Sequence, residues 1–349
     1  MTPRGGEAVY KSEGHPFVRS QNIGLGHLIL DDIAYIDEDT HQRQKNTELQ
    51  LDDVLLNITG ASIGRSALVN QQIVGGNVNQ HVCIIRANKK LIPSFLCNFL
   101  LSQYGQKQIE SFQAGGNRQG LNFEQIKSIK IGLPSVEEQK KIADLLLLIE
   151  QRITIQNKII EDLKKLKSAI SERFFTSING DVVTLADICD IVKGKQVNGE
   201  FLTDSGNYYV MNGGIEPSGY YDDYNTEANT ISISEGGNSC GYVQFNTTPF
   251  WSGGHCYTIQ NITNNVEKLY LYHYLKCNED TIMKLRIGSG LPNIQKKDLA
   301  KFRVIVPIIE QQKTISAFLS LLERKVQVET DILIAVQSEK QYLLRQMFI

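Results

Sequence analysis

The chain repeats one ten-residue pattern at a separation of 173 residues. The pattern reads LPSVEEQKKI from residue 133 and VPIIEQQKTI from residue 306, so that Pro134 corresponds to Pro307 and Gln139 to Gln312. Each copy opens a long stretch that contains neither glycine nor proline. Solenoid repeats are about 20–50 residues long, so this separation indicates two copies of a larger unit, a globular part followed by a helix. A duplicated unit of this kind suits a duplicated target.

Both glycine-free stretches predict helices with the same apolar seam. Apolar residues recur at steps that alternate between four and three, which is the heptad spacing of a coiled coil. About 40 residues at 1.5 Å each form a rod of roughly 60 Å, and such a rod needs a partner along its seam. The same two seam positions are polar in both copies. The seam positions of the paired region are Ile153, Gln156, Ile160, Leu163, Lys167, Ile170, Val326, Glu329, Leu333, Val336, Lys340 and Leu343.

The nearest partner for each helix is its own copy in the same chain. Two copies related by a pseudo-two-fold axis would pack antiparallel, with each seam facing the other. One register pairs Gln156 with Lys340 and Lys167 with Glu329, and it pairs apolar residues with apolar residues elsewhere. We expect this register. The alternative is that each helix packs only on its own globular part, but a narrow seam repeated with the same interruptions is more than that packing requires.

The two globular parts differ in sequence but share the order of their elements. Each has an apolar strand, a glycine-rich turn and a second strand, at residues 53–69 in the first part and 230–245 in the second. A second glycine pair leads into another strand, and a helix and a third polar loop follow. The helices are expected from Pro93 to about Phe112 and from Leu269 to about Leu285. These patterns predict two α/β domains built on one plan.

Several loops carry side chains that can bind bases and phosphates. Asn and Gln can form two hydrogen bonds to adenine, and Arg can do so with guanine. Glycine lets a backbone approach a ligand closely. Any one such residue is more often an ordinary solvated loop residue, but the set on glycine turns favours a binding surface. The candidates are Arg19, Ser20, Gln21, Asn22, Thr59, Ser62, Arg65, Asn77, Asn79, Gln80, His81, Asn117, Arg118 and Gln119 in the first part, and Lys193, Lys195, Asn212, Ser234, Asn238, His255 and Arg286 in the second.

Composition limits the class of protein. No apolar run approaches the ~20 residues of a membrane span, and the start lacks the apolar segment of a signal peptide, so we expect a cytoplasmic protein. The six cysteines form no CxxC pair and are expected to be buried and reduced. The net charge is −2 overall, +1 for residues 1–133 and −4 for residues 181–306. A DNA ligand would therefore need local positive charge, or charge supplied by a partner.

Familiar catalytic motifs are absent from the sequence. It contains no GxGxxG before a helix, no Walker lysine loop and no HExxH zinc motif. It also lacks the Asn-Pro-Pro-Tyr type of signature of adenine methyltransferases and a PD-(D/E)xK nuclease pattern. The six histidines are too far apart in sequence to suggest a local metal site. We therefore expect a chain that performs no chemistry by itself and holds no metal or cofactor.

The tandem arrangement resembles the specificity subunit of type I restriction–modification systems. Two divergent domains are each followed by a near-identical helix whose motif contains Glu137 and Gln139 in one copy and Glu310 and Gln312 in the other. The first domain adds the segments TPRGG from residue 2 and PFVRSQNI from residue 16. The resemblance covers the whole chain.

The resemblance implies an α+β fold with four parts. Two α/β target-recognition domains are joined by two long helices that form an antiparallel intramolecular coiled coil. The implied target-recognition domains are residues 1–133 and 179–306, and the implied conserved helices are residues 134–178 and 307–349.

The resemblance also implies a function. Each target-recognition domain would read one half of a split site in double-stranded DNA, and the paired helices would fix the gap between the halves. Two modification (methyltransferase) subunits would dock on the helices, and restriction subunits would join them. Methyl transfer from S-adenosylmethionine and ATP- and Mg-dependent cleavage would belong to those partners. The bases read and the spacer length do not follow from the sequence.

The chain departs from the family pattern in one place. Residues 184–195 read as the first strand and entry turn of the second domain, and the first domain has no counterpart. We expect either a truncated start or compensation in trans by the C-terminal end. Either way, residues 1–15 should be less well ordered, and restoring the strand should raise DNA affinity.

Two other readings remain open at this point. The chain could be a coiled-coil scaffold whose two domains bind proteins, and its near-neutral charge favours that reading because phosphate contacts need Lys and Arg. It could also work with a fused nuclease–methylase. The matched seams and the two divergent loop sets favour DNA recognition.

Overall fold

The computed structural model describes residues 10–113, 120–288, 290 and 292–348. The chain divides into two compact units. Unit 1 comprises residues 1–157 and 331–349, and unit 2 comprises residues 158–330. Helix α5 (Val136–Ser177) and helix α10 (Ile309–Gln346) each contribute one part to each unit. The sequence-based prediction of two long helices is confirmed.

The described part of unit 1 contains two small sheets and four short α-helices. One sheet has the strand order β2-β1-β5 and the other the order β4-β3-β6. All neighbouring strands are antiparallel except the parallel pair β1 and β5. The elements are β1 (His15–Val18), β2 (Ala34–Ile36), α1 (Glu38–Arg43), β3 (Val54–Asn57), β4 (Ser66–Leu68), β5 (Asn77–Val78), β6 (Val82–Ile85), α2 (Pro93–Leu101), α3 (Gln103–Ser111) and α4 (Phe123–Lys127).

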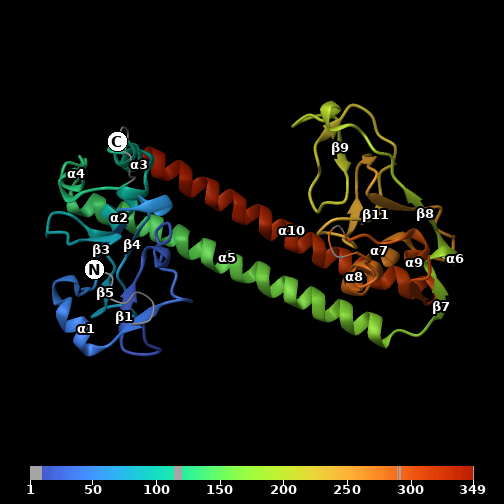
Figure 1. The fold of residues 1–349 in the computed structure, drawn as a ribbon, viewed down its shortest axis with the longest axis horizontal. Helices are drawn as coiled ribbons and strands as arrows, with labels where there is room; N and C mark the ends of the chain where they lie inside the picture. The colour runs from blue at the N-terminus through green and yellow to red at the C-terminus, as the bar shows by residue number, and fades with distance from the viewer. Residues whose placement is uncertain (1–9, 114–119, 289, 291, 349) are drawn as a thin grey trace. The chain divides into compact units, whose positions relative to one another are not determined.

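The core of unit 1 joins the short helices to both long ones. Figure 1 shows α2 and α3 beside the first turns of α5 and the last turns of α10. Phe348 is buried, with its ring centroid 5.1 Å from that of Phe95 and 6.1 Å from that of Phe99. Leu146 of α5 and Leu344 of α10 belong to the same buried cluster. The end of α10 is therefore part of the core of unit 1.

Unit 2 repeats this plan with more strands. Its largest sheet has the order β12-β11-β14-β8, and β15 pairs with β7 in a separate two-stranded sheet. Phe175 of α5 packs edge-on against Tyr270 and Tyr274, so the end of α5 joins the core of unit 2. The elements are β7 (Asp181–Thr184), α6 (Leu185–Ile188), β8 (Asp190–Lys193), β9 (Tyr208–Met211), β10 (Tyr220–Tyr221), β11 (Thr230–Ser234), β12 (Val243–Asn246), β13 (Trp251–Ser252), β14 (Cys256–Gln260), α7 (Lys268–Cys277), α8 (Glu279–Met283), α9 (Lys296–Ala300) and β15 (Arg303–Val306).

Each expected single helix of the globular parts is broken in two. Ser102 separates α2 from α3 because its backbone is extended and its hydroxyl accepts a hydrogen bond from the amide of Gly105 at 3.1 Å. Ser is a preferred N-cap residue, and here it starts a new helix rather than continuing the old one. In unit 2 the break lies at Asn278, between α7 and α8. The prediction of uninterrupted helices is wrong at these two residues.

The predicted seam is the covered face of both long helices. Ile153 and Ile160 are 9% and 7% exposed, whereas Ile155, outside the seam, is 57% exposed. All twelve predicted seam positions are buried or half-buried. In unit 1, Glu150 of α5 forms an ion pair with Lys340 of α10. Leu146, one turn earlier in α5, shares a cluster with Leu344, one turn later in α10. This order is antiparallel, as predicted.

The register differs from the predicted one. Lys167 pairs with Glu323 at 2.7 Å rather than with Glu329, and Lys340 pairs with Glu150 rather than with Gln156, a displacement of six residues in each case. The observed register gives each seam lysine a carboxylate partner. The predicted register would have given Lys340 only a neutral carboxamide, and an ionised acceptor forms the stronger hydrogen bond to an ammonium group. The predicted pairing is therefore wrong, although all twelve predicted seam positions are buried or half-buried.

The repeated motif has a clear structural role at its glutamine. Gln139 is 1% exposed; its carbonyl accepts from the amide of Ile92 at 2.9 Å, and its amide donates to the carbonyls of Lys90 and Pro134, both at 3.0 Å. One side chain thus fastens the start of α5 to the segment that enters α2.

Gln312 makes the same three bonds in unit 2. Its carbonyl accepts from the amide of Glu267 at 2.7 Å, and its amide donates to the carbonyls of Asn265 and Pro307 at 2.9 and 2.8 Å. The side chain is fully buried. The 173-residue repeat therefore preserves one set of three hydrogen bonds, here called the glutamine bracket, between the long helix and the globular part of each unit.

The strand pair of β7 with β15 in unit 2 has no counterpart in the described part of unit 1. Residues 130–133 correspond to β15 at the 173-residue shift, but they pair with no strand. Most of the segment expected to be poorly ordered, residues 1–9, lies outside the described residues. No helix in the described ranges is long and apolar enough to cross a membrane.

Burial of His273 predicts that unit 2 loses stability in mild acid. His273 on α7 is 3% exposed and bonds to Ser320 of α10 at 2.9 Å, and burial lowers its pKa to about 4. The neutral ring is therefore favoured in the folded state, so this contribution is full above pH ~6.5 and is lost as the pH falls toward 4. At about pH 5 the loss should be about 2 kcal/mol.

The measurement is urea unfolding at neutral pH and at about pH 5. His273→Gln removes the titrating group, so the variant should lose about 2 kcal/mol less than the native chain between the two pH values. Equal losses in the two proteins would contradict this role for His273.

Candidate functional site

In each unit, an equivalent set of hydrogen bonds, here called the frame, holds the candidate loops in place. In unit 1 the side chain of Asn57, at the end of β3, donates to the carbonyl of Ser20 at 2.8 Å and to the hydroxyl of Ser62 at 3.1 Å. In unit 2 Ser234, at the end of β11, donates to the carbonyl of Gly213 at 2.7 Å. In both units, a polar residue at a strand end thus fixes one candidate loop, residues 19–22 in unit 1 and the loop of Asn212 in unit 2.

The backbone bonds of the two frames also correspond. In unit 1, Ile58 donates to the carbonyl of His81 at 2.9 Å and accepts from Leu121 at 2.8 Å. In unit 2, Glu235 donates to His255 and accepts from Ile294, at 2.9 and 2.8 Å. His81 and His255 therefore hold equivalent places at the start of the strand beside the glycine turn. The residues compared are Ile58, His81 and Leu121 in unit 1 and Glu235, His255 and Ile294 in unit 2.

Glycines with positive φ make these turns possible. Gly60 and Gly64 have φ of 75° and 85° in unit 1, and Gly237 and Gly241 have φ of 80° and 95° in unit 2. Residues with a Cβ atom rarely adopt this conformation. No atom lies within 4 Å of where a Cβ would stand at Gly60 or Gly237, so the turns have open space beside them.

Three candidate loops of unit 1 come together. The hydroxyl of Thr59 lies 2.5 Å from Nδ1 of His81, and Asn57 links residues 19–22 to the glycine turn. Gln80 lies next to this cluster, with its amide 3.4 Å from Nε2 of His81. Arg65 is exposed beyond the turn. The loop with Asn117, Arg118 and Gln119 lies outside the described residues.

Arg19 is held by an internal partner. Its guanidinium donates to the carbonyl and to a carboxylate oxygen of Asp32, at 2.5 and 3.1 Å, and Gln21 donates to the same carboxylate at 2.7 Å. The Arg19 side chain is only 14% exposed. Asp32 therefore shapes this loop, although the sequence analysis did not name it.

Four candidates are buried and serve the frame. Asn22 and Asn77 are 1% and 0% exposed, and the side chain of Asn77 bonds to His41 at 2.7 Å and to the carbonyl of Gln44 at 2.9 Å. Asn79 and Ser234 are also buried. Eight candidates are exposed, namely Gln21, Arg65, Gln80, Lys193, Lys195, Asn238, His255 and Arg286. Six are half-buried, namely Arg19, Ser20, Thr59, Ser62, His81 and Asn212.

In unit 2 the candidates gather around a residue that the sequence analysis missed. Glu235 lies 2.5 Å from Nζ of Lys193 and 3.5 Å from Nδ1 of His255. The backbone amide of His255 bonds to the side chain of Asn212 at 3.2 Å. Glu235 follows β11 directly and lies in the turn SEGG. Its position between an apolar strand and two glycines is the sequence signal that could have identified it as a loop residue of the site.

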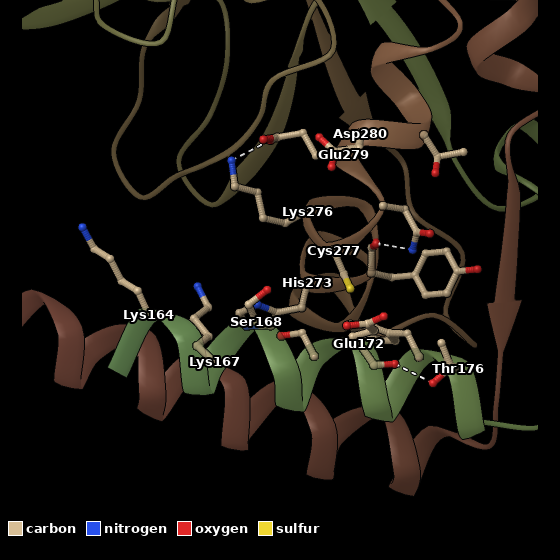
Figure 2. Close-up of a pocket in the computed structure, with 15 residues that line it drawn as sticks. Lys164, Lys167, Ser168, Glu172, Thr176, His273, Lys276, Cys277, Glu279 and Asp280 are labelled. Atoms are coloured by element: carbon tan, nitrogen blue, oxygen red, sulfur yellow. Dashed lines mark hydrogen bonds and ion pairs between the residues drawn. The ribbon is translucent and has the colours of Figure 1, made fainter. Parts of the chain in front are cut away.

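A separate cavity of unit 2 holds none of the candidate loop residues. It has a volume of about 730 Å³ and lies between α5 and the helices α7 and α8. Figure 2 shows Lys276 paired with Glu279, and Thr176 bonded back to its own helix. Lys167 and His273, which line it, bond to Glu323 and Ser320 of α10, so this cavity belongs to the packing of the helices and adds nothing to the loop surface.

The described residues offer no cluster of the usual metal ligands. No group of three or more His, Cys, Asp or Glu side chains in the described ranges could hold a metal ion. Five of the six cysteines are buried, and all six are free. Burial raises the pKa of Cys83 and Cys97 to about 11, which disfavours the nucleophilic thiolate. What the loops offer is hydrogen bonding and charge.

Known proteins are similar to this chain over most of its length. A family model described as the type I restriction modification DNA specificity domain matches residues 7–165 and again residues 179–338. The putative type I restriction enzyme MjaX specificity subunit of Methanocaldococcus jannaschii is 23% identical over 356 residues, covering 90% of this chain and 82% of that protein. The putative type I specificity subunit S.MpnORF638P of Mycoplasma pneumoniae is 32% identical over 154 residues, covering 44% of this chain and 41% of that protein.

Solved structures share the fold. The crystal structure of the type I restriction–modification S subunit from M. genitalium superposes with a TM-score of 0.68 at 19% identity, covering 98% of this chain and 91% of that one. A chain from a structure concerned with complex assembly and conformational transition of the type I R-M system gives a TM-score of 0.61 at 18% identity, covering 95% and 90%.

Proposed function

Because the two family matches together span most of the sequence, the chain belongs to the type I restriction–modification specificity subunits, and we propose that it recognises a split DNA site, one half with each unit. The observation that carries this proposal is the repeated frame. The same hydrogen bonds hold the loops in both units, while the side chains on those loops differ. Equivalent frames with unlike surfaces suit two different half-sites.

In this proposal the exposed loop residues contact DNA directly. The exposed Arg65 and Gln80 and the half-buried His81 in unit 1, and the exposed Lys195, Asn238 and Arg286 in unit 2, can reach phosphates or base edges. The buried asparagines contribute by holding the loops. The coiled coil sets the spacing between the halves, since a long helix keeps a fixed length.

A second apolar stripe on each long helix supports partner docking. On α5 of unit 1, Leu145, Leu148 and Ile155 are 39%, 62% and 57% exposed, at heptad spacing outside the seam. Adding 173 gives Phe318, Leu321 and Val328 on α10 of unit 2, which are 43%, 65% and 43% exposed. A basic residue interrupts both stripes, Arg152 in one and Lys325 in the other. Exposed apolar stripes mark protein-binding surfaces, and heptad spacing suits a helical partner.

The repetition of this stripe suits two copies of one partner. We assign that place to two modification (methyltransferase) subunits, with restriction subunits joining the complex. Adenine methylation with S-adenosylmethionine and ATP- and Mg-dependent cleavage then belong to the partners, and this chain acts in the cytoplasm as their non-catalytic DNA-reading part. A scaffold with two protein-binding domains is the alternative that the low net charge favours.

Selection from a random pool of DNA duplexes tests the proposal. The chain, co-purified with its modification subunit, should enrich duplexes that share two short fixed blocks separated by a gap of constant length and free sequence. Equal and weak binding of selected and unselected duplexes would contradict DNA recognition by this chain and would favour the scaffold.

A further inference from the structure

One carboxylate in unit 2 joins three strands of the largest sheet at one end. Glu235 follows β11, Lys193 ends β8, and His255 precedes β14. One oxygen of Glu235 lies 2.5 Å from Nζ of Lys193 and accepts from the hydroxyl of Tyr257 at 3.0 Å. The other oxygen has no hydrogen-bond donor in the described structure, and Nδ1 of His255 lies 3.5 Å from it.

Burial in this cluster is uneven. The Glu235 side chain is 11% exposed, whereas the side chains of Lys193 and His255 are 52% and 63% exposed. A buried carboxylate normally needs a compensating partner, and here both neighbours that can carry positive charge reach outward from it. Lys193 has three N–H donors, and its bond to Glu235 uses one of them. Nδ1 of His255 faces Glu235, which leaves Nε2 for an outside partner.

We infer that Lys193 and His255 form a subsite for one backbone phosphate of DNA and that Glu235 positions both side chains. This inference rests on the proposed function. Two outward cationic donors match a phosphate, which accepts hydrogen bonds and carries negative charge. The free oxygen of Glu235 is buried, so the cluster offers no acceptor to the amino groups of cytosine and adenine. Gly237, beside Glu235, leaves open space for a backbone to approach.

The subsite belongs to unit 2 alone. Ile58 holds the place of Glu235 in unit 1, so the equivalent histidine, His81, has no carboxylate at that position. Its Nδ1 instead lies 2.5 Å from the hydroxyl of Thr59. His81 therefore occupies the same position in the frame without an acidic partner.

The other ionisable groups around His255 are few. Lys193 and Tyr257 share the first oxygen of Glu235. Cys256 is adjacent in sequence, and Cys240 bonds to the Glu235 carbonyl at 2.9 Å, with Arg286 near Cys240. Lys193 and Arg286 are the basic residues of this group, and Glu235 is its carboxylate.

The salt dependence of DNA affinity tests the inference. Each phosphate contact that is lost lowers the slope of log affinity against log salt by about 0.9. Lys193→Gln should reduce the slope by about that amount, equally for selected and scrambled duplexes. His255→Gln should weaken binding of selected and scrambled duplexes equally, because it removes a second contact to the same phosphate.

Two further variants sharpen the test. Lys268→Gln, an exposed lysine at the start of α7, should leave the slope unchanged. Glu235→Gln retains both cations, so it should weaken binding several-fold with an unchanged slope if Glu235 positions them. Tighter binding by Glu235→Gln would instead mean that the carboxylate only neutralises positive charge, which would overturn its positioning role.

The outcomes separate this inference from the proposed function. If the native complex selects a split site but Lys193→Gln leaves the salt slope unchanged and His255→Gln leaves the affinity unchanged, the phosphate subsite is wrong and DNA recognition stands. If the native complex selects no sequence, the proposed function itself fails.

Discussion

Charged substitutions on the second apolar stripe should abolish partner docking without unfolding the chain. Leu148→Glu with Ile155→Glu should reduce the partners bound per chain from two to one, and adding Leu321→Glu with Val328→Glu should reduce them to none. Burying each native side chain in an interface contributes roughly 1.5–3 kcal/mol, and a buried unpaired carboxylate adds a further cost. Each pair should therefore weaken its contact by more than about 100-fold. Mass photometry of the mixed components measures the stoichiometry.

Exposed neighbours provide the control for this result. Thr154→Glu with Asn157→Glu places the same charge on α5 outside both stripes, at exposed residues, and should retain two partners. Thermal unfolding of all variants should match the native chain within about 0.5 kcal/mol, because the replaced residues are exposed. If the four-fold variant still binds two partners, the docking surface lies elsewhere.

Replacing the buried glutamine Gln312 should strongly lower the free energy of unfolding of unit 2. Gln312→Met keeps the side-chain volume but leaves the amide of Glu267 and the carbonyls of Asn265 and Pro307 without their partner. An unsatisfied buried polar group costs about 1–3 kcal/mol. We expect a loss of about 3 kcal/mol in the free energy of unfolding, or about 6–12 °C in Tm for a unit of this size. Differential scanning calorimetry should detect it.

The adjacent residue gives a matched control. Gln311 is exposed, so Gln311→Met should change the stability by less than about 0.5 kcal/mol. Gln139→Met should lower the stability of unit 1 by an amount similar to the effect of Gln312→Met in unit 2, because the two brackets make equivalent bonds. If Gln312→Met behaves like Gln311→Met, the repeated glutamine is not a structural bracket.

The sequence predicted the long helices and their seam because heptad spacing is a local pattern that depends on only one helix. It did not predict the register, because the ion pairs of Lys167 and Lys340 are made by Glu323 and Glu150, which are not among the predicted seam positions. The choice of partner depends on the geometry of two helices together. The break at Ser102 was missed for a related reason, since serine can cap one helix or continue another.

The candidate loops were found by composition, but the role of each residue was not. Asn22 and Asn77 have the same chemistry as exposed base-reading asparagines, and only the packing of distant segments shows that they are internal. Glu235 was overlooked because an acidic residue is a poor candidate for DNA contact when it is considered alone. Its significance comes from Lys193 and His255, which are distant in sequence and adjacent in the fold.

Exchange of one domain tests whether each unit reads one half of the DNA site. Residues 179–306 would be replaced by the corresponding domain of another family member, and methylated adenines would be mapped in cells that express the hybrid with its modification subunit. In the hybrid, one half of the methylated site should change while the other half is retained. A change in both halves, or in neither, would contradict the assignment of one half-site to each unit.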